Sequence, residues 1–218
     1  MSKPSRGRPV DQSKQAEQKK KLIEATQRLL SEKSFRAITI REIAEAANIN
    51  SAMIRYYFEN KEGLFKALLD RMAEQHFDSI NTLSSEDNPI RAVIRVMLDM
   101  LLDNASMARM IHDEVLQQES PLKDAFIERF PMRMAKLLPK LIAQELQVSD
   151  PRVCKYLAFN LISLIITPFI GDPVRKIAWK ISDEELRDPF WAEHLYTLFI
   201  NGSNYISNRI DSNSERKL

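Results

Sequence analysis

Two short amphipathic segments separated by three residues constrain this chain more than any other feature. In the first, Thr39 is followed three residues later by Glu42, which is the spacing of a capping box at a helix start. Apolar residues then recur at helical spacing as far as residue 47. Asn48 comes next, and asparagine is the residue other than glycine that best tolerates a left-handed backbone. We therefore expect a short helix that ends at Asn48.

The second segment begins directly after this turn. Asn50 or Ser51 can cap a third helix, which is predicted to run to about Tyr57. Two short helices joined by a three-residue turn form a helix-turn-helix. A fourth helix is expected to start at Lys61 or Glu62. The apolar residues expected in the core of this region are Ile40, Ile43, Ile49, Ile54 and Phe58.

Glycine is scarce, with four glycines in 218 residues, and the four lie far apart. Folds rich in strands use glycine in turns and bulges, and phosphate-binding loops need several glycines close together. A phosphate-binding loop therefore cannot be assembled from this sequence. No segment of useful length has the alternating period of a strand. The sequence predicts an all-α fold.

The sequence predicts three successive parts. Residues 1–13 form a flexible basic arm, residues 14–60 a helix-turn-helix domain, and residues 61–218 a larger helical domain. The first helix is expected from about Ala16 to Glu32. Further helices are predicted over 89–103, 106–118, 121–146, 150–167, 174–180 and 189–208. We expect Pro131 and Pro139 to kink the 121–146 helix, and a break over 168–173.

Charge is distributed unevenly along the chain. Residues 1–66 contain 14 Lys and Arg against 8 Asp and Glu, whereas the remaining residues contain 18 against 22. The basic excess indicates an acidic partner for the first third of the chain.

The sequence also predicts where the protein works. Cys154 is the single cysteine, which excludes a disulfide within the chain and a cysteine zinc site. The polar, basic N-terminus is unlike a signal peptide. The longest nearly continuous apolar run, 157–170, is shorter than the roughly 18–20 residues that span a bilayer. We expect a cytoplasmic protein with no membrane partner.

The segment 38–69 reads ITIREIAEAANINSAMIRYYFENKEGLFKALL. Over this whole length it resembles the DNA-binding domain of TetR-family regulators, in a capped second helix, a turn, a short third helix, Tyr57-Phe58 and Lys61-Glu62. Two positions depart from the family pattern. Asn48 stands where glycine is usual, and Arg55 stands where tyrosine is frequent. An arginine at position 55 can still reach a phosphate or a guanine edge. The resemblance implies a transcriptional repressor with an N-terminal DNA-binding domain.

Side-chain chemistry independently favours double-stranded DNA as the partner, because phosphate contacts need cations, hydroxyl groups and backbone N–H groups. The predicted phosphate contacts are Thr39, Arg41, Tyr57 and Lys61. In a helix-turn-helix, the first turns of the second of the two helices contact the base edges, and here these are the first turns of the third helix. The residues expected to read bases are Ser51, Ala52, Met53 and Arg55, and the interface is expected to include Asn50 and Tyr56. The alternative is an ordinary solvated surface at positions 41 and 55–57.

The arm carries Arg6-Gly7-Arg8-Pro9, which looks like the core of an AT-hook. Glycine allows close approach of the backbone, and the narrow minor groove of A·T tracts attracts arginine. Arg6 and Arg8 are therefore predicted to contact DNA. A disordered basic tail without this function is the alternative.

Two late apolar segments predict a homodimer. Residues 157–170 are apolar on almost every side, and such a helix is expected to be buried on all sides. We expect one face to pack on the domain core and the other on a second subunit. The resemblance implies that two late helices pair with their symmetry mates in a four-helix bundle. The predicted interface residues are Leu161, Leu164, Ile165, Leu195, Leu198, Phe199 and Gly202. A two-fold dimer reads a pseudo-palindromic operator.

Methionine and phenylalanine are concentrated in the middle of the chain, and methionine adapts to irregular apolar shapes. The resemblance implies a small-molecule effector whose binding releases the operator, and an ordinary core is the alternative for each residue. The predicted pocket residues are Met97, Met100, Met107, Met110, Phe126, Phe130, Met134 and Phe159.

An enzyme is the least favoured class. His112, Asp113 and Glu114 are adjacent in sequence, and adjacent helical residues do not face one another. The sequence has neither His-Glu-x-x-His nor Gly-x-Ser-x-Gly. We predict no catalytic residues, metal or cofactor. A helix-turn-helix adaptor for protein contact is the remaining alternative, and steep salt dependence of DNA binding would argue against it.

Overall fold

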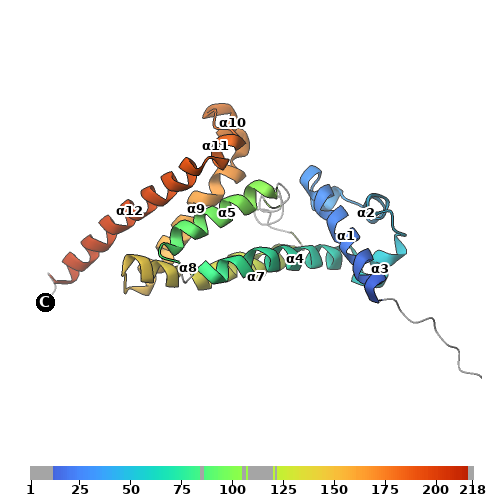
Figure 1. Ribbon diagram of the computed structural model, residues 1–218, viewed down its shortest axis with the longest axis horizontal. Coiled ribbons are helices and arrows are strands. Elements are labelled where there is room, and N and C mark those ends of the chain that lie inside the picture. Colours follow the sequence, from blue (N-terminus) through green and yellow to red (C-terminus); the bar gives the residue numbers. More distant parts are fainter. Residues whose placement is uncertain (1–11, 84–85, 105–106, 108–119, 121, 216–218) are drawn as a thin grey trace, which may run out of the picture. The chain divides into compact units, whose positions relative to one another are not determined.

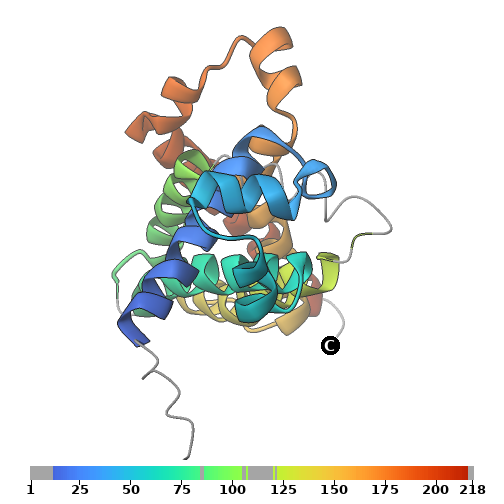
Figure 2. The ribbon, with the colours of Figure 1, turned by 90° about the vertical axis from the view of Figure 1, so that its right-hand side faces the viewer.

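The computed structural model describes residues 12–83, 86–104, 107, 120 and 122–215, with side chains except at 76–82 and 204–215. The chain divides into two compact units, residues 1–68 and 69–218. Helices and turns make up the described residues, and no strand occurs among them (Figures 1 and 2). The predicted all-α class is confirmed.

The first unit contains four helical segments and the start of a fifth. They are α1 (Gln12–Glu32), the short 3₁₀ turn η1 (Phe35–Ala37), α2 (Ile40–Ala47), α3 (Ala52–Phe58) and α4 (Lys61–Thr82). Helix α1 starts at Gln12, before the predicted Ala16 and within the predicted arm. The fully buried side chains of this unit include Leu22, Ile38, Ile43, Ile54, Leu64 and Phe65. Of the five predicted core residues, Ile43 and Ile54 are fully buried and Ile49 and Phe58 are half-buried. The prediction is wrong for Ile40, which is 37% exposed.

Both ends of α2 follow the predicted chemistry. The Thr39 hydroxyl accepts the backbone N–H of Glu42, and the Glu42 carboxylate accepts the backbone N–H of Thr39, so the capping box is confirmed. At the other end, Asn48 has φ 53°. The N–H groups of Asn48 and Ile49 bond back to the carbonyls of Glu45 and Ala44, at 3.1 and 2.9 Å, in a Schellman motif.

The turn between α3 and α4 is tighter than the turn that follows α2. Glu59 has φ 67° and ψ −46°, and the Asn60 N–H donates to the Phe58 carbonyl at 2.7 Å, which makes a γ-turn of the rarer, strained kind. The Asn60 side chain then caps α4 by accepting the N–H of Gly63 at 2.8 Å. A Cβ atom at Gly63 would lie only 2.0 Å from the Phe58 carbonyl oxygen. Glycine is therefore required at this position.

The second unit includes the remainder of α4 and seven further described helices. These are α5 (Pro89–Asp103), α7 (Lys123–Arg129), α8 (Pro131–Leu146), α9 (Pro151–Ile170), α10 (Asp172–Ala178), α11 (Asp183–Arg187) and α12 (Pro189–Glu215). Helix α9 packs against α5, α8, α10 and α12, and α5 also packs against α8, α11 and α12. The core of the unit lies between these helices.

Proline explains two departures from the predicted helices. The predicted 121–146 helix breaks into α7 and α8 at Phe130, because Pro131 lacks an N–H and starts the new helix at its first position. Pro168, where a break was predicted, instead lies inside α9, which continues to Ile170. Helix α11 was not predicted, and most of the predicted 106–118 helix lies outside the described residues.

Helix α9 is less buried than its composition predicts. The side chains buried within the unit are Cys154, Leu157, Ala158, Leu161 and Ile165, whereas Tyr156 and Phe159 are exposed. One face of α9 is thus buried by its own unit, and the other, which the sequence assigned to a second subunit, is exposed in the single chain. With 20 residues and a mean hydropathy of 1.8 over an 18-residue window, α9 is long and apolar enough to cross a membrane by length and composition alone. A core helix of a soluble protein meets the same criteria.

Candidate nucleic-acid interface

Helix α3 divides its residues between the core and the solvent. Ile54 is fully buried, Met53 is half-buried, and Ala52, Arg55 and Tyr56 are exposed. Before the helix, Ser51 and Asn50 are also exposed. The Asn50 side-chain oxygen accepts the N–H of Ala52 at 2.8 Å, so Asn50, and not the Ser51 hydroxyl, caps this helix. The predicted base-reading residues therefore lie together on and just before one short helix.

Thr39 and Arg41 lie at the start of α2 and are exposed. The Arg41 side chain is 87% exposed and pairs only with its neighbour Glu45, at 2.8 Å, among the described contacts. An exposed ion pair contributes little to stability, so the guanidinium can exchange this partner for a phosphate at small cost. The start of α2, with its free backbone N–H groups, adds the positive end of the helix dipole.

Tyr57 and Lys61 are turned toward their own domain. The Tyr57 hydroxyl donates to the Gln18 side chain of α1 at 2.6 Å. The Lys61 ammonium donates to the backbone carbonyls of Phe35 and Ile38 at 2.9 and 2.8 Å and lies 4.3 Å from the Phe35 ring centroid. Both residues thus hold α3 and α4 in place, a role that the sequence did not reveal because their partners are distant in the chain.

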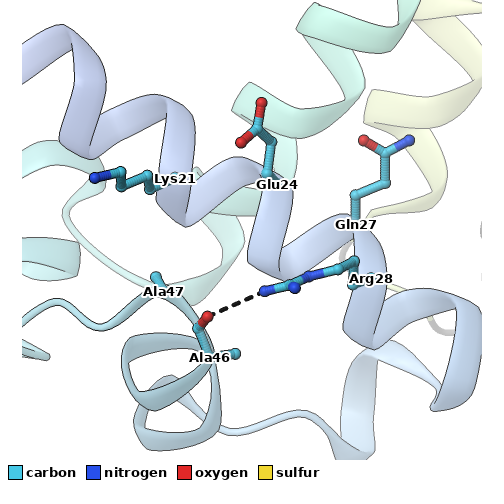
Figure 3. Close-up of a pocket in the computed structure, with 6 residues that line it drawn as sticks. All are labelled: Lys21, Glu24, Gln27, Arg28, Ala46 and Ala47. Atoms are coloured by element: carbon cyan, nitrogen blue, oxygen red, sulfur yellow. Dashed lines mark hydrogen bonds between the residues drawn. The ribbon is translucent and has the colours of Figure 1, made fainter.

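Arg28 provides a similar link that sequence reasoning missed. Its guanidinium, on α1, donates to the Ala46 carbonyl near the end of α2 at 3.0 Å (Figure 3). The bond crosses a surface pocket of about 370 Å³ between the two helices, lined by Lys21, Glu24, Gln27, Arg28, Ala46 and Ala47. Because the last carbonyls of a helix lack partners within it, this bond fixes the orientation of α2.

The other predicted site residues are placed as follows. Arg6, Arg8 and Met110 lie outside the described residues. Of the predicted pocket residues, Met97, Met100, Met107, Phe126, Phe130 and Met134 are buried, and the Phe126 and Phe130 rings stack at 5.0 Å. Phe159 is exposed on α9 and does not join them. A second surface pocket, along α5, includes none of the predicted residues; Leu83, Glu86, Asp87, Asn88, Arg91, Ala92, Arg95 and Val96 line it.

The predicted dimer residues fall into two groups. Leu161, Ile165, Leu195 and Phe199 are buried within their own unit, where another subunit cannot reach them. These four belong to the protomer core because they face the helices that pack on α9 and α12. Leu164 is half-buried, and Leu198 and Gly202 are exposed. No group of three or more His, Cys, Asp or Glu side chains that could hold a metal occurs within the described part of the chain.

The capping box of α2 also makes the first unit sensitive to acid. Lys33, whose ammonium lies 2.6 Å from the Glu42 carboxylate, and the Thr39 N–H and hydroxyl lower the pKa of Glu42 from 4.5 to about 2. The folded state therefore binds this proton less readily than the unfolded state. The resulting stabilisation is complete above pH 4.5 and is lost as the pH falls toward about 2.

We expect Glu42→Gln to flatten the acid limb of the stability curve. Glutamine preserves the hydrogen bond to the Thr39 N–H but removes the titrating charge that pairs with Lys33. The measurement is the denaturant midpoint of both proteins across this pH range, with Glu62→Gln, an exposed carboxylate at the start of α4, as the control. Parallel curves for the Glu42→Gln and parent proteins would contradict the assignment.

Comparison with known proteins identifies this domain. Residues 22–68, which include α2, α3 and the start of α4, match the family model described as bacterial regulatory proteins, tetR family. The helix-turn-helix domain belongs to the TetR family. Asn48 and Arg55, the two departures from the TetR pattern, leave the geometry of the helix-turn-helix intact.

Curated relatives, described as HTH-type transcriptional regulators, match only part of the chain. The chain is 29% identical over 103 residues to the probable HTH-type transcriptional regulator YttP of Bacillus subtilis, covering 44% of this chain and 50% of YttP. It is 46% identical over 52 residues to YvkB of the same organism, covering 24% of this chain and 28% of YvkB. With TtgR of Pseudomonas putida the identity is 27% over 125 residues, covering 56% and 60%. The chain thus spans between about a quarter and three fifths of these relatives.

Solved structures extend the likeness of fold to nearly the whole chain. The fatty acid degradation regulator FadR of Bacillus halodurans has a TM-score of 0.67 at 17% identity and covers 85% of this chain and 95% of its own. The Bacillus subtilis FadR, solved in complex with stearoyl-CoA, has a TM-score of 0.67 at 18% identity, covering 84% and 98%. The second unit therefore shares the helical fold of these regulators.

Proposed function

We propose that the protein is a sequence-specific DNA-binding transcriptional regulator of the cytoplasm that represses from a pseudo-palindromic operator. The observation that carries this proposal is the exposed face of α3, with Ala52, Arg55 and Tyr56, in a TetR-family helix-turn-helix. Ala52 offers an apolar contact to a thymine methyl, and Arg55 can reach a guanine edge. Thr39, Arg41 and the start of α2 would hold the phosphates.

Reading a pseudo-palindromic operator requires a homodimer, and exposed apolar side chains support one. Large apolar side chains that are more than half exposed lie on α9, at Tyr156 and Phe159, and on α12, at Phe190 and Leu198. The two helices pack against each other, so a second copy could cover both outward faces in a four-helix arrangement. Two recognition helices related by a two-fold axis would enter major grooves about 34–36 Å apart. We call Tyr156, Phe159, Phe190 and Leu198 the outer face.

A small, largely apolar ligand would relieve repression. The buried methionines and phenylalanines of α5, α7 and α8 form an adaptable core into which such a ligand could insert. The structurally similar FadR of Bacillus subtilis was solved with stearoyl-CoA, which has a long apolar chain. A ligand that prefers the DNA-free state must lower DNA affinity by the factor by which DNA lowers ligand affinity.

The direct test is selection of bound duplexes from a random DNA library, followed by titration of the selected duplex at several salt concentrations. A pseudo-palindrome with steep salt dependence would support the proposal. No enriched sequence, together with weak binding at low salt, would overturn it and favour a protein adaptor. Arg55→Ala is expected to relax selection at one position of each half-site, whereas Arg41→Ala should weaken binding to all sequences alike.

The basic arm gives a separate prediction. Replacing Arg6 and Arg8 with alanine should lower operator affinity and reduce the salt slope by up to about 1.8, because each phosphate neutralised contributes about 0.9. The control removes two exposed cations from α8, Lys136 and Lys140. A slope change no larger than that of the control would contradict an AT-hook role for the arm.

A further inference from the structure

A short arm joins the two helices of the outer face. It consists of α10, α11 and the residues between them, 171–188, and it begins directly after α9 and ends directly before α12. In both views it projects from one end of the second unit (Figures 1 and 2). Helix α11 packs against α5 and α12, whereas α10 packs on α9 alone among the principal helix contacts.

Helix α10 presents an apolar surface to solvent. Val174 and Ile177 lie on one helical face, three residues apart, and Trp179 follows at the end of the helix. All three are more than 60% exposed in the single chain. Single exposed apolar residues are ordinary, but three large ones on and beside a seven-residue helix form a patch, and patches of this kind mark interaction surfaces.

The patch is held rigidly by Arg175, whose side chain lies on the opposite side of α10 and is only 6% exposed. Its guanidinium donates to the carbonyls of Pro168 and Ile181 at 3.0 and 2.7 Å. It also donates to the carboxylates of Asp172 and Asp183, both at 2.5 Å. These bonds connect the end of α9 with α10 and the start of α11. The arm is therefore pre-organised, which lowers the entropic cost of docking its apolar surface.

The size of the patch indicates what covers it. A stable protein interface takes about 800 Å² from each partner, and a helix about 10 Å long cannot provide that area alone. The patch must therefore extend a larger interface. The nearest exposed apolar side chains of the outer face are Phe190 and Leu198 on α12, which begins where the arm ends.

We propose that the arm docks on a second copy of this chain, with Val174, Ile177 and Trp179 covered by the partner and extending the dimer interface formed by the outer face. This inference rests on the proposed homodimer. The arm would then act as a clamp at each end of a two-fold interface, because symmetry places the same contact twice.

Tryptophan fluorescence tests this directly, because Trp179 and Trp191 are the two tryptophans of the chain. In a Trp191→Phe protein, Trp179 reports alone. We expect blue-shifted emission and several-fold weaker quenching by acrylamide at concentrations where sedimentation shows a dimer, and a return to exposed behaviour on dilution to monomer. If Trp191→Phe does not fold, the difference between the parent and Trp179→Phe proteins isolates the same signal.

Two further variants separate this inference from the dimer itself. Val174→Ser with Ile177→Ser should raise the dimer dissociation constant at least tenfold, whereas Lys180→Ser, an exposed residue of the same arm, should leave it unchanged. A dimer in which Trp179 stays fully accessible and the double serine variant associates normally would overturn the arm contact and leave the homodimer standing. A protein that is monomeric at every concentration would overturn both.

Discussion

Gly63→Ala is expected to destabilise the first unit by about 3 kcal/mol or more, a large effect for the addition of one methyl group. The added Cβ would lie 2.0 Å from the carbonyl oxygen of Phe58 and 3.1 Å from its carbonyl carbon. Both are backbone atoms at the end of α3, so no flexible side chain can move aside. Relief requires displacement of the γ-turn at Glu59 or of α3 itself.

Chemical denaturation followed by circular dichroism measures this loss, and operator affinity should fall with it because α3 carries the reading residues. Gly202→Ala is the matched control, since its added Cβ would meet nothing within 4 Å in the single chain. In a helix interior that change favours folding by up to about 1 kcal/mol. A Gly63→Ala protein as stable as the parent would show that the α3–α4 turn is not as tight as described.

Two leucines predicted for the same interface should behave in opposite ways. Leu161 is fully buried in its own unit, so Leu161→Ala is expected to cost about 2–5 kcal/mol of unfolding free energy through the cavity it leaves. Leu198 is 51% exposed, so Leu198→Ala should change monomer stability by no more than about 0.5 kcal/mol but weaken dimerisation.

Because association itself stabilises a folded dimer, unfolding should be compared at two protein concentrations. The deficit of Leu161→Ala should persist at both, whereas that of Leu198→Ala should depend on concentration. Equal behaviour of the two variants would argue against the outer face as the site of association.

The helix-turn-helix could be predicted from the sequence because its determinants are local. The capping box joins residues three apart, and the left-handed turn at Asn48 is a property of that one residue and its nearest carbonyls. The helical period placed most other helices for the same reason. Local rules also explain the partial failure at the prolines: Pro131 starts a helix, whereas Pro168 lies in the last turn of one.

Features that depend on contacts between residues distant in the chain could not be predicted from the sequence. An apolar helix has faces that pack on its own unit and faces that do not, and composition cannot separate them, so Leu161 and Leu198 received the same prediction. Likewise, nothing near Lys61 in sequence indicates that its ammonium binds the carbonyls of Phe35 and Ile38. The arm formed by α10 and α11 was not predicted, because its structure depends on the buried Arg175, which bonds to four residues at positions from the end of α9 to the start of α11.

The separation of buried and exposed residues on α3 has a consequence for how such a protein can change the operator that it binds. Ile54 and the turns at either end hold the helix, whereas the side chains of Ala52, Arg55 and Tyr56 are exposed. Substitutions at these three positions therefore escape the usual conflict between new activity and stability. A lineage carrying this domain can acquire a new operator by single steps, each of which yields a folded protein, while the capping and turn residues stay fixed.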